Sequence, residues 1–129
     1  MDRLKGKVAV ITGGNSGVGE ATAKLFAKEG VVVITARREA ALTKVAEEIK
    51  AAGGEAFAVS TDISKPEDPE RLMELVLKKY GKIDILINNA GILETGLKPI
   101  DRFLDEDLDR IVETNQKGTM RCMRAAARR

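Results

Sequence analysis

The sequence contains no histidine, no tryptophan and only one cysteine, Cys122, among its 129 residues. Without histidine the chain cannot supply a His-based catalytic triad, a histidine metal ligand or the usual general base at neutral pH. We therefore predict no metal site. A single cysteine excludes an intramolecular disulfide and favours a reducing, cytoplasmic location.

Aromatic residues are scarce as well, with one tyrosine and three phenylalanines, which argues against a surface for stacking nucleic-acid bases. The 22 basic and 20 acidic residues leave a net charge of +2, too balanced for a nucleic-acid groove or a basic membrane surface. No apolar run approaches the roughly 20 residues of a membrane span, and the N-terminal MDRLKGK lacks the apolar segment of a signal peptide. We expect a single domain over residues 1–129, with neither nucleic acid nor a membrane as its partner.

Strand patterns and helix patterns alternate four times along the sequence. Short apolar, β-branched runs predict buried strands, and these cover residues 7–12, 31–35, 56–59 and 83–87. Helical spacing follows the first strand, where the apolar face would comprise Val18, Ala21, Thr22, Leu25 and Phe26. A long final helix is predicted to begin near Asp105 or Glu106. The alternation predicts an α/β, Rossmann-like three-layer fold: a parallel sheet of strand order 3-2-1-4 with helices on both faces.

The third helix has two candidate starting points. Asp68 followed by Pro69 is typical of an N-cap with proline at the first helical position. Ser64 and Glu67 form a competing capping box one turn earlier. We favour Asp68, because Pro69 deeper in the first turn would lack an N–H. The predicted buried face of this helix comprises Leu72, Leu75, Val76 and Tyr80.

The stretch TGGNSGVGE, residues 12–20, joins the first strand to the first helix and contains four glycines. A helix N-terminus presents unpaired N–H groups and partial positive charge, and glycines let an anion approach the backbone closely. Gly19 has a second predicted task, close packing of the helix on the sheet. A P-loop would require lysine after Gly19, where Glu20 stands instead. A merely tight strand-to-helix turn is the alternative interpretation.

Three further motifs accompany this loop: Asp62 after the third strand, Asn88-Asn89-Ala90-Gly91 after the fourth, and Asn115 in TNQKG. With T-G-x-x-x-G-x-G at residues 12–19, the set resembles the short-chain dehydrogenase/reductase family, over about residue 4 to the last residue. The resemblance implies that the glycine loop binds the pyrophosphate of a nicotinamide dinucleotide. Its cofactor-binding residues would be Gly13, Asn15, Ser16, Gly17, Val18 and Gly19.

The resemblance also assigns roles to the later motifs. Asp62 would accept a hydrogen bond from the adenine amino group, with the Ile63 backbone beside it; a helix cap or Asx turn is the alternative role for Asp62. Asn115 would support catalysis through a water chain, and its spacing from Leu108 and Ile111 predicts that it faces the sheet. The residues expected along the adenosine ribose are Asn89, Ala90 and Gly91.

The end of the second strand distinguishes NAD from NADP. An acidic residue there binds the ribose hydroxyls of NAD, whereas arginine accommodates the 2′-phosphate of NADP. Ala36 occupies the position of the acid, and Arg37 and Arg38 follow it. Forked, charge-assisted bonds from these arginines predict NADP, with NAD as second choice. The alternative is that both are solvated residues opening a helix.

The family's catalytic tyrosine and lysine, at i and i+4, have no counterpart in this sequence. The only tyrosine is Tyr80, and GKID follows it. We expect a cofactor-binding N-terminal half that is truncated relative to the family fold and catalytically incomplete. Two alternatives stay open: an oxidoreductase for which another chain supplies the serine, tyrosine and lysine, and a structural half-domain with an empty loop.

Two surfaces of such a half-domain are predicted to drive self-association, most simply into a dimer. The strand over residues 83–87 would have an open apolar edge. The last helix would lose the elements that cover it, although Gln116 and Arg121 make it more polar.

Overall fold

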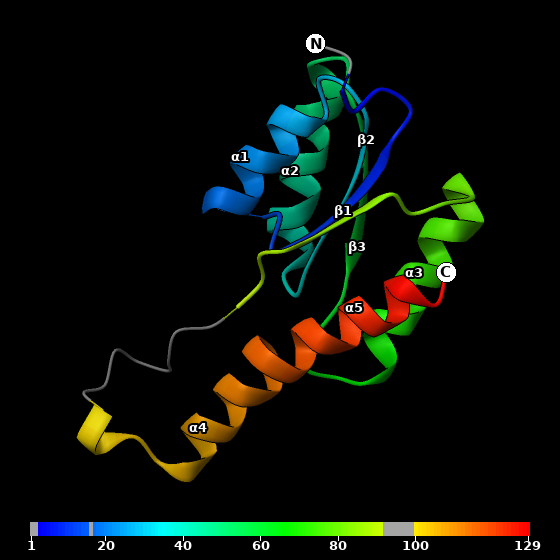
Figure 1. Ribbon diagram of the computed structural model, residues 1–129. Helices are drawn as coiled ribbons and strands as arrows, with labels where there is room; N and C mark the ends of the chain where they lie inside the picture. The colour runs from blue at the N-terminus through cyan, green and yellow to red at the C-terminus, as the bar shows by residue number, and fades with distance from the viewer. Residues whose placement is uncertain (1–2, 16, 92–99) are drawn as a thin grey trace.

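The computed structural model describes residues 3–15, 17–91 and 100–129. Four strands form one sheet, and helices cover both of its faces (Figure 1). In chain order the elements are β1 (Val8–Thr12), α1 (Gly17–Phe26), β2 (Val31–Ala36), α2 (Glu39–Ala51), β3 (Glu55–Ser60), α3 (Glu67–Tyr80), β4 (Ile85–Asn88), the 3₁₀ turn η1 (Ile100–Arg102), α4 (Asp105–Ile111), the π-helix η2 (Val112–Gly118) and α5 (Thr119–Ala127).

The sheet order is β3-β2-β1-β4 and every pairing is parallel, which confirms the predicted fold class. In this order the chain reverses direction across the sheet between β1 and β4, and a crevice forms at the carboxyl ends of the strands on either side. β1 is buried along its whole length, as a central strand covered on both faces should be.

Alternate residues of the central strands build two cores. On one face, Val10 and Val33 pack with α3 and α5. On the other, Ile11 and Ile34 pack with α1 and α2. Cys122 of α5 is fully buried in the first core, and burial raises the pKa of its thiol to about 11. Among the described residues, no helix has both the length and the apolar character needed to cross a membrane.

The predicted apolar face of α1 is confirmed at Phe26, which packs against the core on this side of the sheet, and is wrong at Val18 and Leu25. Val18 is 73% exposed and Leu25 is 60% exposed, whereas Gly19 and Ala23 are buried. The helix turns its smallest residues toward the sheet because its first turn lies directly against the end of β1. Close approach of the backbones, rather than burial of large side chains, therefore sets the orientation of α1.

The predicted start of α3 is also wrong. The helix begins at Glu67, and Asp68 does not cap it; the Asp68 carboxylate accepts a hydrogen bond from the backbone N–H of Asp62 at 2.8 Å. Pro69 sits buried in the first turn, where its missing N–H loses no helical bond because the first four N–H groups have no partner within a helix. A proline in the first turn of a helix is therefore compatible with a start at Glu67.

The buried face of α3 is confirmed at Leu72 and Val76, and Met73 joins them. Tyr80 is only half-buried, and its hydroxyl donates to Glu55 Oε2 at 3.0 Å across to β3. The residue thus ties the end of α3 to an edge strand.

The last helix begins at Asp105, as expected, and its first turn is closed by Asp107, whose carboxylate accepts from the Leu104 N–H at 2.9 Å. Its middle third, η2, is π-helical, which the sequence did not indicate. A π segment carries more residues per turn than an α-helix, so helical spacing no longer predicts which side chains face the sheet.

Asp84 connects the start of β4 to the start of β1. Its carboxylate accepts the N–H of the buried Val8 at 2.8 Å, and its own N–H donates to the Val8 carbonyl at 2.9 Å. Asp84 lies within the predicted strand over residues 83–87, but the observed strand β4 begins one residue later, at Ile85.

Replacing Asp84 should destabilise the fold. Asp84→Ala leaves the buried Val8 N–H without this acceptor, and we expect a loss of about 1–3 kcal/mol in the free energy of unfolding. Urea denaturation measures this loss. Asp84→Asn keeps an acceptor oxygen and should retain more stability; equal losses in both variants would contradict the assignment.

The same contact predicts a pH dependence. The Val8 N–H, and after it Lys82, hold the pKa of Asp84 below its ordinary value. The unfolded state therefore binds a proton more readily, and the stabilisation is complete above the unfolded pKa of about 3.9. It is lost as the pH falls through the folded pKa. Urea midpoints measured from pH 7 to pH 3 should fall less steeply for Asp84→Ala than for the wild type.

Candidate functional site

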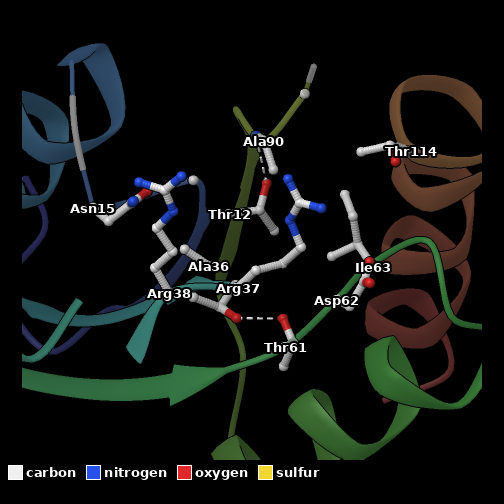
Figure 2. Close-up of a pocket in the computed structure, with 13 residues that line it drawn as sticks. Thr12, Asn15, Ala36, Arg37, Arg38, Thr61, Asp62, Ile63, Ala90 and Thr114 are labelled. Carbon is white, nitrogen blue, oxygen red and sulfur yellow. Dashed lines mark hydrogen bonds between the residues drawn. The ribbon is translucent and has the colours of Figure 1, made fainter. Parts of the chain in front are cut away.

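A pocket of about 580 Å³ lies at the carboxyl ends of the strands, a volume suited to a small-molecule ligand (Figure 2). Side chains from β1, β2, the loop after β3, the segment after β4 and η2 meet there. The lining residues are Thr12, Gly13, Asn15, Thr35, Ala36, Arg37, Arg38, Thr61, Asp62, Ile63, Ala90, Gly91 and Thr114.

The glycine loop brings the start of α1 against β1. Gly13 has φ of +70° and Gly17 has φ of +56°, conformations that L side chains rarely adopt. A Cβ at Gly19 would lie 2.1 Å from the Gly13 carbonyl oxygen, so only glycine fits, as predicted for close packing. A Cβ at Gly17 would meet open space among the described residues, which leaves the helix N-terminus accessible. Ser16 lies outside the described residues.

Thr12 joins this loop to the end of β4. Its hydroxyl oxygen accepts the N–H groups of Asn89 and Ala90 at 3.1 and 3.0 Å, and donates to the Ile87 carbonyl at 3.5 Å. The Asn89 amide in turn donates to the Gly13 carbonyl at 3.2 Å. Thr12 and Asn89 thereby fix the position of Ala90 at the pocket wall.

The end of β2 brings two arginines to the pocket. Both side chains extend from the strand end toward the cavity in Figure 2, Arg38 on the side of Asn15 and Arg37 on the side of Ile63. Ala36, the last residue of β2, precedes them and has no carboxylate. The hydroxyl of Ser60 donates to the Arg37 carbonyl at 3.0 Å and ties this turn to β3.

Asp62 forms an Asx turn at the far wall of the pocket. Its Oδ1 accepts the Ser64 N–H at 3.0 Å and the Ser64 hydroxyl at 2.5 Å, the local role weighed as an alternative from the sequence. Partial burial raises the pKa of Asp62, but the two bonds from Ser64 and the nearby charge of Arg37 outweigh it and hold the pKa below its ordinary value. The carboxylate is therefore ionised at neutral pH and offers acceptor lone pairs to the pocket.

Asn115 lies within η2 and is exposed, so the prediction that it faces the sheet with the apolar residues is wrong. The π turns rotate it away from the position that α-helical spacing gives. Its side chain instead points to the segment after β4: a Cβ at Gly91 would lie 3.2 Å from Asn115 Oδ1. Asn115 thus lies beside the pocket wall.

The structure brings most of the candidate binding residues to one cavity. Those that line it are Gly13, Asn15, Arg37, Arg38, Asp62, Ile63, Ala90 and Gly91. Four others do not line it: Gly17, Val18 and Gly19, in the first turn of α1, and Asn89, directly after β4.

Sequence reasoning missed the hydroxyl groups of the pocket. Thr12, Thr35 and Thr61 each come at or just after the end of a parallel strand, and Thr114 precedes Asn115. Their position at strand ends is the sequence signal that predicts a place in the pocket, because ligands in such folds bind at the carboxyl ends of the strands.

Comparison with known proteins agrees with this geometry. The sequence profile of the family described as short chain dehydrogenase matches residues 7–129. The chain belongs to this family. It is 41% identical over 118 residues to an uncharacterized oxidoreductase of Listeria innocua, covering 91% of this chain and 47% of that protein. It is also 41% identical over 123 residues to tropinone reductase-like 1 of Erythroxylum coca, covering 90% and 43%.

Solved structures of short-chain dehydrogenases superpose closely on this one. A metagenomic short-chain oxidoreductase in complex with NADP has a TM-score of 0.89 and 35% identity, covering 96% of this chain and 56% of that one. An NAD+-bound xylitol dehydrogenase has a TM-score of 0.90 and 28% identity, covering 98% and 48%. The chain thus spans about half the length of the short-chain dehydrogenases that it matches.

Removing the Thr12 hydroxyl should loosen the pocket wall. In Thr12→Val the Asn89 and Ala90 N–H groups lose their acceptor, and we expect a loss of about 1–3 kcal/mol in the free energy of unfolding. Urea denaturation measures this loss, and amide hydrogen exchange at residues 89 and 90 should accelerate. Thr12→Ser keeps the oxygen and serves as the control; if the serine variant were equally destabilised, the hydroxyl would not be responsible.

Proposed function

We propose that this chain is an NADP-binding domain, equivalent to the cofactor-binding part of a short-chain dehydrogenase and catalytically incomplete by itself. The preference for NADP over NAD rests on one observation: Arg37 and Arg38 enter the pocket directly after Ala36, where an acid would bind the ribose of NAD. A bound nicotinamide dinucleotide would supply hydride chemistry.

The pocket suits the adenosine and pyrophosphate parts of such a cofactor. Gly13, Asn15 and the open N-terminus at Gly17 would hold the pyrophosphate with backbone N–H groups. Two guanidinium groups would pair with the 2′-phosphate, for which their planar forks are well matched. Asp62 and the Ile63 backbone would bind the adenine. The NADP complex of a structural relative supports this assignment, although another relative binds NAD+.

Catalytic incompleteness is supported by the position of the only tyrosine. Tyr80 stands on α3, does not line the pocket and donates its hydroxyl to Glu55. Burial, and then Glu55, raise the pKa of Tyr80 well above its ordinary value, whereas a catalytic tyrosine needs a lowered one. A cytoplasmic location is part of the same proposal, on the ground of a single buried thiol at Cys122.

The two alternative functions are separated by one titration and one assay. Binding of NADPH, followed by the anisotropy of its own fluorescence, excludes a structural module with an empty loop. Oxidation of bound NADPH by a panel of ketones and aldehydes would show turnover by this chain alone. We expect binding without turnover, and turnover only when a segment with the serine, tyrosine and lysine is added.

Arg37 should determine the choice of cofactor. A charged hydrogen bond contributes about 1.5–3 kcal/mol, so Arg37→Ala should weaken NADPH binding roughly 10- to 150-fold and leave NADH binding nearly unchanged. Calorimetric titration with both cofactors measures the ratio. Arg110→Ala, an exposed arginine on α4, is the matched control and should bind both as the wild type does. Equal losses for both cofactors in Arg37→Ala would refute the NADP assignment.

We also propose that the chain self-associates, through the last helix or the edge of β4. In the described sheet β4 pairs only with β1, and its three apolar residues are half-buried. Met120 and Met123 are 62% and 53% exposed, and Leu108 and Val112 extend the apolar surface along the same continuous helix. Burial of such side chains favours association.

Sedimentation distinguishes the two surfaces. We expect the mass of the wild type to rise with concentration toward a dimer, and Met120→Glu to shift this rise to at least tenfold higher concentration because a charge would enter the contact. A dimer that persists unchanged in Met120→Glu would indicate the β4 edge. A monomer at all concentrations would refute self-association.

A further inference from the structure

A buried pair of hydroxyl groups lies at the base of the pocket. Thr35, near the end of β2, and Thr61, directly after β3, have their Oγ1 atoms 2.5 Å apart. Thr35 is 1% exposed and Thr61 is 4% exposed, yet both line the cavity. Figure 2 shows Thr61 at the base of this cavity. The surface that they retain therefore faces the site of the ligand.

The pair has one hydrogen more than it uses. Each hydroxyl can donate one hydrogen bond, and a contact between two hydroxyls uses only one of their two hydrogens. Within residues 3–15, 17–91 and 100–129, neither hydroxyl has a second hydrogen-bond partner. A buried donor without an acceptor costs about 1–3 kcal/mol, so native proteins rarely leave one.

The surrounding backbone groups already have partners of their own. The Thr35 carbonyl accepts the Gly13 N–H at 2.7 Å, and the Thr61 N–H donates to the Ala36 carbonyl at 3.0 Å. Asp62 Oδ1 is engaged by Ser64. Because both threonines line the cavity, a bound ligand can supply the acceptor for the remaining hydroxyl hydrogen.

We infer that the Thr35–Thr61 pair donates this hydrogen to a ring nitrogen of the adenine base of the cofactor. The inference rests on the proposed function. Adenine carries ring nitrogens that accept hydrogen bonds and an amino group that donates them. A hydroxyl donor below the base complements the ionised Asp62, an acceptor at the wall. Together the two groups would recognise the base by opposite hydrogen-bonding character.

Valine substitutions test whether the Thr35–Thr61 pair contacts the ligand or only stabilises the fold. Thr35→Val or Thr61→Val alone leaves one buried hydroxyl without its partner and should lower the urea midpoint. The double variant removes both hydroxyls at nearly constant shape and should recover much of that midpoint. Its affinity for NADPH, measured by fluorescence anisotropy, should nevertheless fall about 2- to 10-fold, as expected for one lost hydrogen bond.

Three comparisons test whether the loss is specific. Thr43→Val makes the same change at an exposed position of α2 and should alter neither stability nor affinity. Thr35→Ser/Thr61→Ser keeps both hydroxyls and should keep wild-type affinity. The double valine variant should lose affinity equally for adenosine 2′,5′-bisphosphate, which has the adenine, but not for reduced nicotinamide mononucleotide, which lacks it.

The outcomes divide clearly. Wild-type NADPH affinity in a folded double valine variant overturns the inference and leaves a water to accept the hydrogen. Equal losses for the adenine and nicotinamide probes also overturn it, because they indicate general distortion. If the wild type binds neither NADPH nor NADH, the proposed function fails and the inference with it.

A second measurement gives a decisive result in the wild type whether or not the variant folds. The wild-type chain is titrated with adenosine 2′,5′-bisphosphate analogues in which carbon replaces N1, N3 or N7 in turn. If the double valine variant is folded, its affinity for one of these analogues should equal its affinity for the parent compound. In the wild type, that analogue should bind about 2- to 10-fold more weakly than the parent. Equal binding of all analogues to the wild type overturns the inference.

Discussion

The close contact between Gly13 and Gly19 is the constraint on which the pocket depends. The first turn of α1 lies so near the end of β1 that a single methyl group at Gly19 would overlap the Gly13 carbonyl. The same short segment bonds to β2 through the Gly13 N–H and to the end of β4 through Thr12 and Asn89. Thr12 and Gly13 therefore align three walls of the cavity. A shift of α1 by even an ångström would displace the glycine loop from the arginines that share its pocket.

The fold could be predicted because its signals are local and agree with one another. Buried parallel strands appear as short β-branched runs, and right-handed crossovers leave few ways to connect them. The predictions from sequence fail where a specific contact in the fold overrides a general rule. Asp68-Pro69 predicts a start at Asp68, yet α3 begins at Glu67, because the first-turn N–H that proline lacks has no partner within the helix. Helical spacing places Val18 and Leu25 on the apolar face of α1, whereas packing against a glycine loop requires small residues on the buried side.

The site was predictable to a lesser degree. Glycines, arginines and Asp62 carry patterns with a direct chemical meaning, and the structure brings them to one cavity. The threonines do not, because a β-branched residue at a strand end is equally suited to a buried strand. The position of Asn115 could not be derived from helical spacing, since the π segment that contains it interrupts the α-helical period. A π segment in an otherwise regular helix is often found at functional sites.

The single thiol gives the molecule an internal probe. Cys122 sits on α5 with no accessible surface, in the core that joins α5 to α3 and the sheet. An alkylating reagent needs an exposed thiolate, so labelling requires α5 to separate from the sheet. The rate of modification, compared with that of a free thiol, then reports the equilibrium for detachment of this one helix. Because η2 and α5 form one continuous helix, that rate also reports how firmly Thr114 is held at the pocket.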